Sequence, residues 1–140
     1  MAAMGPEERD AFLRETRIGK LATLESDGSP TIVPIWYEWD GSVARMFTTR
    51  GTPKVRRINT DPRAALTVET GVGEPEAWVT IEGAARVVET DAMPLVRRLA
   101  ERYYDAAKAE ATLKRWEPGA ANWVVIELAP SRMRSLAPGG

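Results

Sequence analysis

The amino-acid sequence predicts a mainly β fold, a barrel of about six antiparallel strands with two to four short helices. Short runs of β-branched and aromatic residues are separated by turn clusters, and Asp27-Gly28 and Asp40-Gly41 are typical of hairpins. Helical patterns occur only before or between the strands, which favours a barrel over a βαβ sheet. The chain of 140 residues fits one domain spanning residues 1–140.

The first half of the chain is predicted to contain a helix and three strands. Pro6 and the acidic residues after it are typical of a helix start. Strands are expected over residues 18–25, 31–39 and 43–49, and three consecutive antiparallel strands would form a meander. Pro34 cannot donate a ladder hydrogen bond, so the second strand should lie at an edge of the sheet, or its pairing should be interrupted there.

The second half is predicted to add a short helix after residue 52 and strands over residues 64–69 and 77–89. The longer of these strands should bend at Gly83. A helix is expected to begin at Thr90 or Asp91, and its apolar positions share one face: Met93, Val96, Leu99, Ala100 and Tyr103. An alanine-rich helical stretch at residues 106–111 and a last strand over residues 123–128 complete the elements.

Composition excludes several classes of chemistry. The chain has no cysteine, which excludes disulfides, thiolate zinc sites and cysteine nucleophiles. It has no histidine, which excludes Ser-His-Asp catalysis and the commonest transition-metal and haem ligand. A net charge of −1 gives no overall field toward nucleic acid or an anionic membrane. Neither a targeting segment nor a membrane-spanning run is visible, so a cytoplasmic protein is expected.

The most informative stretch is the strand-to-helix turn at residues 48–59. Four cations fall within eight residues of this slightly acidic chain: Arg50, Lys54, Arg56 and Arg57. Thr52 suits the N-cap and Pro53 the first helical position, so the first turn should present free backbone N–H groups and the positive end of the helix dipole. The sequence therefore predicts a site for an anion such as phosphate at this turn.

The alternative reading of this stretch is an ordinary solvated, charged helix face. Thr48, Thr49 and Thr52 are close in sequence to the cations and add hydroxyl groups. Phosphate is commonly bound by hydroxyl donors together with cationic side chains. This combination favours the anion site. It is not a Gly-rich phosphate loop, because Gly51 stands alone.

Five segments occur in a characteristic order: Ile18-Gly19-Lys20-Leu21-Ala22-Thr23-Leu24, Val33-Pro34-Ile35-Trp36-Tyr37, Met46-Phe47-Thr48-Thr49, Thr52-Pro53-Lys54 and Asn59-Thr60-Asp61-Pro62-Arg63-Ala64-Ala65-Leu66. In this order they resemble the pyridoxamine 5′-phosphate oxidase-like superfamily. Members of that superfamily bind a flavin or a deazaflavin at the dimer interface of a split barrel. The first two segments look especially like the branch that often uses the deazaflavin F-420.

The resemblance implies roles for particular residues. Lys54 would bind the cofactor phosphate, with Thr48 and Thr49 nearby. The segment Val33, Pro34, Ile35 and Trp36 would lie along the ring system. The family's usual Ser-Arg-Lys reads Thr52-Pro53-Lys54 here, so Arg57 or Arg50 would have to replace the missing arginine. Trp78 stands where some relatives place a glutamine that contacts the cofactor.

The implied function is that of a homodimeric oxidoreductase, which uses F-420 or FMN to transfer hydride to or from a small organic substrate. Such chemistry needs no side-chain nucleophile, because the cofactor carries it. The alternatives are an FMN-binding carrier or sensor without turnover, and a haem-handling relative, for which the usual axial histidine is missing.

The remaining candidates receive structural roles. Glu69, Glu82 and Glu127 occur singly and are expected to be solvated or paired. Arg97, Arg98 and Arg102 are assigned to an exposed helix face, although a long acidic cofactor tail could recruit them. Trp39, Trp116 and Trp123 are assigned to packing, whereas Trp36 and Trp78 could line a pocket or pack in the core.

Overall fold

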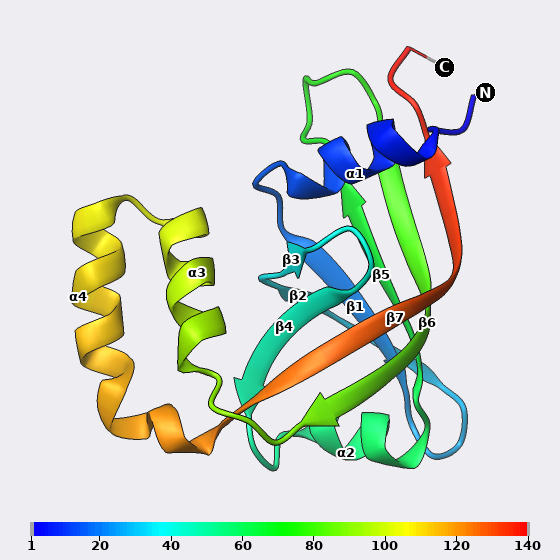
Figure 1. Ribbon diagram of the computed structural model, residues 1–140. Coiled ribbons are helices and arrows are strands. Elements are labelled where there is room, and N and C mark those ends of the chain that lie inside the picture. Colours follow the sequence, from blue (N-terminus) through cyan, green and yellow to red (C-terminus); the bar gives the residue numbers. More distant parts are fainter. Residues whose placement is uncertain (1, 140) are drawn as a thin grey trace.

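The computed structural model describes residues 2–139, which form one curled antiparallel sheet with helices around it (Figure 1). The predicted mainly β split-barrel class is confirmed. The seven strands are β1 Gly19–Leu24, β2 Pro30–Ile35, β3 Glu38–Trp39, β4 Ala44–Thr49, β5 Arg63–Glu69, β6 Trp78–Val88 and β7 Trp123–Leu136. The helices are α1 Pro6–Arg14, α2 Pro53–Thr60, α3 Met93–Tyr103, α4 Ala106–Trp116 and the 3-10 helix η1 Glu117–Asn122. None of the described helices is long and apolar enough to cross a membrane.

The strand order is β2-β1-β5-β6-β7-β4-β3, so the predicted meander is wrong. The expected strand over residues 31–39 is broken at Trp36 and Tyr37, and its two parts belong to opposite edges of the sheet. Tyr37 is completely buried, and its hydroxyl donates a 2.7 Å hydrogen bond to the Leu13 carbonyl. This inward anchor turns the chain away from β1 and carries it across the barrel.

β2 is an edge strand, as Pro34 predicts. The Glu25 N–H donates to the Ser29 carbonyl at 2.8 Å, and the antiparallel alternation that starts from this pair directs the backbone groups of Ile32 and Pro34 away from β1. Pro34 therefore stands where its missing N–H breaks no ladder bond. The outer backbone edge of β2 remains free of other strands in the described sheet.

The long strands β6 and β7 pair along almost their whole length, with a register shift between Glu82 and Gly83. A Cβ atom on Gly83 would lie 1.9 Å from the Ala129 carbonyl oxygen, so only glycine allows this approach. The predicted bend is confirmed. β7 continues beyond the expected residue 128 to Leu136, because the same irregularity accommodates Pro130.

Two apolar cores divide the molecule. The larger fills the barrel interior, and the second lies between the outer face of β4 and β7 and the helical hairpin α3–α4. In Figure 1 this hairpin stands to one side of the barrel, while α2 closes one end and α1 covers the other. The predicted α3 face is correct for Val96, Leu99 and Ala100, whereas Met93 and Tyr103 are only partly buried and Leu95 also joins the core.

Candidate functional site

The predicted strand-to-helix turn is present: three residues separate the end of β4 from the start of α2. Thr52 takes the N-cap position, but its hydroxyl makes no capping bond and lies 3.4 Å from the Thr48 hydroxyl. The amides of Val55 and Arg56 donate to the Thr52 carbonyl at 3.1 and 3.2 Å. Within residues 2–139 the N–H groups of Gly51 and Lys54 have no acceptor, so two free amides remain at this turn.

Lys54 is a half-buried cation that has no anionic partner among residues 2–139. Its Nζ donates a 3.0 Å hydrogen bond to Oγ1 of Thr48, which is buried. No carboxylate of the described chain lies within 4.0 Å of this nitrogen. Burial, followed by the positive charge of Arg57, lowers the pKa of Lys54. An anion bound here would offset both effects, because a nearby negative charge favours the charged ammonium.

Arg57 extends the polar cluster to the strands on the other side of α2. Its Nε donates to Oγ1 of Thr23 at 2.8 Å, and it forms an ion pair with Glu25 at 3.1 Å. The Thr23 hydroxyl lies 3.4 Å from that of Thr31. We call this set the anion cluster: Thr23, Thr31, Thr48, Thr52, Lys54 and Arg57. Sequence reasoning missed Thr23, although a threonine at an inward position of β1, two residues after the core residue Leu21, is a usable indication.

The other two cations of the turn point elsewhere. Arg50 forms an ion pair with Glu89 and donates to the Ala121 carbonyl. Arg56 donates to the Gly51 carbonyl at 2.8 Å. Arg57 is therefore better placed than Arg50 to replace the missing family arginine. A cavity of about 360 Å³ runs along one side of α2 and is lined by Glu25, Ser26, Pro53, Arg56, Arg57 and Thr60.

The predicted ring-binding residues lie on β2 and at its end. Val33 and Ile35 are half-buried and pack against the interior core, whereas Pro34 is exposed at the free edge. Trp36 packs in the second core, with its ring stacked on Tyr103 at 5.0 Å and 9°. β2 thus runs from Thr31 in the anion cluster to the aromatic cluster at Trp36.

A second free edge meets the first at the anion cluster. β3 pairs only with Ala44 and Arg45, so no described strand covers the outer edge of the other half of β4. That half ends in Thr48, which belongs to the anion cluster, and in Thr49, which is exposed. The uncovered edge of β4 therefore ends beside Lys54, whereas the uncovered edge of β2 reaches the anion cluster through Thr31, Thr23 and Arg57.

Trp78 is not brought to this site. It begins β6, where it pairs with Glu69 and Leu136. Ala84 is the β6 residue that pairs with Arg63, just after α2. Trp78 lies six residues before Ala84, which is about 20 Å along the strand. Three strand spacings, about 14 Å, separate it from the Ile35 end of β2.

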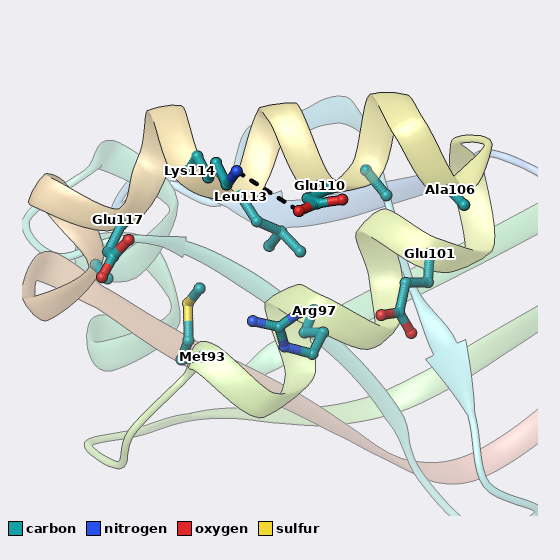
Figure 2. Close-up of a pocket in the computed structure, with 10 residues that line it drawn as sticks. Met93, Arg97, Glu101, Ala106, Glu110, Leu113, Lys114 and Glu117 are labelled. Atoms are coloured by element: carbon teal, nitrogen blue, oxygen red, sulfur yellow. Dashed lines mark ion pairs between the residues drawn. The ribbon is translucent and has the colours of Figure 1, made fainter.

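A groove of about 730 Å³ lies between α3 and α4 and contains none of the predicted site residues. Figure 2 shows Met93 and Leu113 at its apolar floor, with Arg97 between the helices and Glu110 paired with Lys114. Its volume suits a small molecule. Its charges are mixed and exposed, however: within residues 2–139 Arg97 also lacks a carboxylate partner, but it is exposed to solvent, whereas Lys54 is half-buried.

The strand carboxylates are paired, as expected. Glu69 pairs with Lys20, Glu82 with Arg134, and Glu127 with both Arg45 and Arg86. The described residues hold no group of three or more acidic side chains that could bind a metal ion. Of the arginines on α3, Arg98 pairs with Glu38, while Arg102 binds carbonyls at the end of α1.

Comparison with known proteins agrees with this architecture. The family model described as pyridoxamine 5′-phosphate oxidase matches residues 6–137. A curated relative, the F420H(2)-dependent biliverdin reductase of Mycobacterium tuberculosis (strain CDC 1551 / Oshkosh), is 37% identical over 79 residues. The match covers 55% of each protein, so the chain spans about half the length of this relative.

Two solved structures give the same picture. One named F420 reductase has a TM-score of 0.70 and 25% identity, over 89% of this chain and 94% of the other. The conserved hypothetical protein Rv2991 from Mycobacterium tuberculosis has a TM-score of 0.73 over 98% of this chain and 93% of the other. At 24% identity this second structure supports the fold alone.

Proposed function

The chain belongs to the pyridoxamine 5′-phosphate oxidase family, and on that premise we propose that it is an oxidoreductase with a flavin-type cofactor, either F-420 or FMN. The cofactor phosphate is proposed to bind at Lys54. The observation that carries this proposal is the half-buried Lys54 ammonium, which has no carboxylate partner in residues 2–139 and lies beside a free amide and two hydroxyls.

The residues present fit a phosphate group. Lys54 offers its Nζ and its backbone N–H, Thr48 and Thr52 offer hydroxyls, and Arg57 adds a second positive charge on the same side of α2. Charge-assisted bonds to phosphate are about twice as strong as neutral ones. The mixture of cation, amide and hydroxyl donors is the chemistry that a phosphate requires.

The ring system is proposed to lie along the free edge of β2, at Val33, Pro34, Ile35 and Trp36. The outward backbone groups of Ile32 and Pro34 supply hydrogen-bonding partners there. Thr49 lies on the opposing edge of β4. When bound, a flavin or deazaflavin supplies the two-electron chemistry of hydride transfer. The chain's own residues bind, orient and shield it.

F-420 is the cofactor we favour, because both the curated relative and one solved neighbour carry that cofactor in their names. The substrate is proposed to be a small organic molecule that stacks on the exposed side of the ring. The protein is proposed to act in the cytoplasm. Trp78 can serve such a site only across an interface between two copies, because within one copy it lies three strands from β2.

The test is a titration of the purified protein with F-420 and with FMN, followed by the quenching of tryptophan fluorescence. We predict that Lys54→Ala weakens binding of the preferred cofactor by about 10- to 100-fold, the loss of one or two charge-assisted hydrogen bonds. Lys114→Ala is the matched control, since Lys114 is exposed on α4 and far from the anion cluster.

Equal binding by wild type and Lys54→Ala would contradict the proposed anchor. Tight binding with no reduction of any acceptor, by any reductant, would instead favour the non-catalytic carrier or sensor. Because binding and turnover are measured on the same samples, the two results are distinguishable.

A further inference from the structure

We propose that Tyr103 is a positioning residue for the cofactor ring. Tyr103 lies in the last turn of α3 and holds the chain at the end of β2. The cofactor ring is proposed to lie beside this end of β2. This inference rests on the proposed function, because it concerns ring binding along residues 33–36. It assigns a role in the site to the helical hairpin α3–α4, which stands outside the barrel (Figure 1).

The ring of Tyr103 holds the side chain of Trp36. The two rings are nearly parallel, with 5.0 Å between their centroids. Tyr104 packs edge-on against Trp36 at 4.9 Å, and Trp116 approaches it at 6.1 Å. Trp36 therefore has aromatic neighbours from both α3 and α4, and rotation of its side chain would break all three contacts.

The hydroxyl of Tyr103 holds the backbone next to Trp36. It donates a 2.7 Å hydrogen bond to the Arg17 carbonyl, just before β1, and accepts the Tyr37 N–H at 3.3 Å. One side chain thus fixes both the ring of Trp36 and the backbone of the following residue. This is the place where the chain leaves β2 and crosses to β3.

Tyr103 is itself held firmly. Its neighbour Arg102 donates to three carbonyls at the end of α1, those of Leu13, Arg14 and Glu15, at 3.2, 2.9 and 2.7 Å. The Arg102 guanidinium also lies 5.5 Å from the centre of the Tyr103 ring. These contacts attach the end of α3 to the barrel, so that Tyr103 keeps the Trp36 ring in one position.

The anion cluster contains no residue of α3 or α4. Its members come from α2, from the turn before it, and from β1, β2 and β4. Tyr103 should therefore affect binding of the ring and leave binding of the phosphate unchanged. Lys54 should do the reverse. This separation makes the two proposals independently testable.

The experiment compares cofactors with the same ring and no phosphate. Wild type, Tyr103→Phe, Tyr103→Leu and Lys54→Ala are titrated with FMN and riboflavin, and with F-420 and its phosphate-free deazaflavin. We expect Tyr103→Phe to weaken binding of both members of a pair by the same factor of about three to ten, because the backbone beside the ring loses the two hydrogen bonds that the hydroxyl makes to Arg17 and Tyr37. Tyr103→Leu should weaken binding of both members further. Lys54→Ala should bring the affinity for the phosphorylated member close to that for the phosphate-free member, so that the ratio of the two affinities approaches one.

Tyr104→Phe is the matched control, because the Tyr104 hydroxyl makes no hydrogen bond within residues 2–139. Two further readouts separate positioning from loss of stability. Tyr103→Phe should shift the visible absorption band of the bound ring, which Lys54→Ala should leave in place. In the cofactor-free protein, Tyr103→Phe should also speed hydrogen exchange at the Tyr37 amide, and Tyr104→Phe should not.

Ring binding by Tyr103→Phe with wild-type affinity and an unshifted band would overturn the inference and leave the proposed function intact. Failure of wild type to bind any of the four ligands would overturn the proposed function, and this inference with it. Wild-type exchange at the Tyr37 amide in Tyr103→Phe would show that the hydroxyl does not hold this backbone.

Discussion

Lys54 is the residue on which the account depends, and its environment was only partly predictable. A basic helix start with nearby threonines was visible in the sequence. The sequence did not show which of the cations lack a carboxylate partner, because the ion pair between Arg50 and Glu89 forms only when the chain folds. The pairing of Arg57 with Thr23 was not predictable either, because Thr23 lies 34 residues away on β1 and only its inward position on that strand was an indication. The local sequence indicates the type of site, whereas contacts between distant parts of the chain decide which basic residues of the turn remain available to bind an anion.

The lowered pKa of Lys54 predicts a pH dependence of binding. Burial and Arg57 disfavour the charged ammonium, so it loses its proton at a lower pH than an ordinary lysine does. Affinity for an anionic cofactor should therefore fall as pH rises through this lowered pKa, before the usual lysine value of about 10.4 is reached.

Lys54→Arg supplies the comparison, because a guanidinium does not deprotonate at these pH values. Titrations of the preferred cofactor between about pH 7 and 10 should show a decline for wild type and a flat response for the variant. An identical decline in both proteins would assign the pH dependence to another group.

At the scale of elements, the break between β2 and β3 is the feature that sequence patterns failed to show. Residues 31–39 are rich in β-branched and aromatic residues, and nothing local marks Trp36 and Tyr37 as the point at which the strand breaks. The break depends on Leu13 and Tyr103, which hydrogen-bond Tyr37 from distant parts of the chain. Hairpin turns, the edge position of Pro34 and the bend at Gly83 were predictable because each depends on backbone chemistry within a few residues.

The caps of two helices provide a prediction about stability. The Asp105 side chain accepts the Lys108 N–H at 2.8 Å and so caps α4, whereas the Thr52 hydroxyl does not cap α2. We expect Asp105→Ala to lower the free energy of unfolding by about 1 kcal/mol. Thr52→Ala should cost less than about 0.5 kcal/mol, because a 3.4 Å hydroxyl contact is weak.

Urea unfolding of both variants beside wild type measures these differences. Equal losses would show that Thr52 caps α2 in solution.

At the scale of the whole molecule, the sheet exposes an outer face that suits a second copy. Ile32, Ala22 and Ala65 form a row across β2, β1 and β5, and Ile32 is 64% exposed. We predict a homodimer that buries this row, because apolar and small side chains on a strand surface favour close packing. Sedimentation at micromolar concentration should show a dimer for wild type and a monomer for Ile32→Glu.

Ala107→Glu, an exposed change on α4, should remain dimeric and serves as the control. A monomeric wild type would contradict the predicted dimer, and with it any contact between Trp78 and the cofactor of another copy.

The central claim is that an anionic cofactor tail binds at the start of α2, at the free amide and ammonium of Lys54. A crystal structure of the protein with F-420 or FMN tests it most directly. We expect phosphate density within hydrogen-bond distance of the Lys54 Nζ and the Thr48 hydroxyl, with the ring extending along β2. A well-occupied cofactor whose phosphate lies elsewhere, while only water lies beside Lys54, would show that this site does not bind the cofactor.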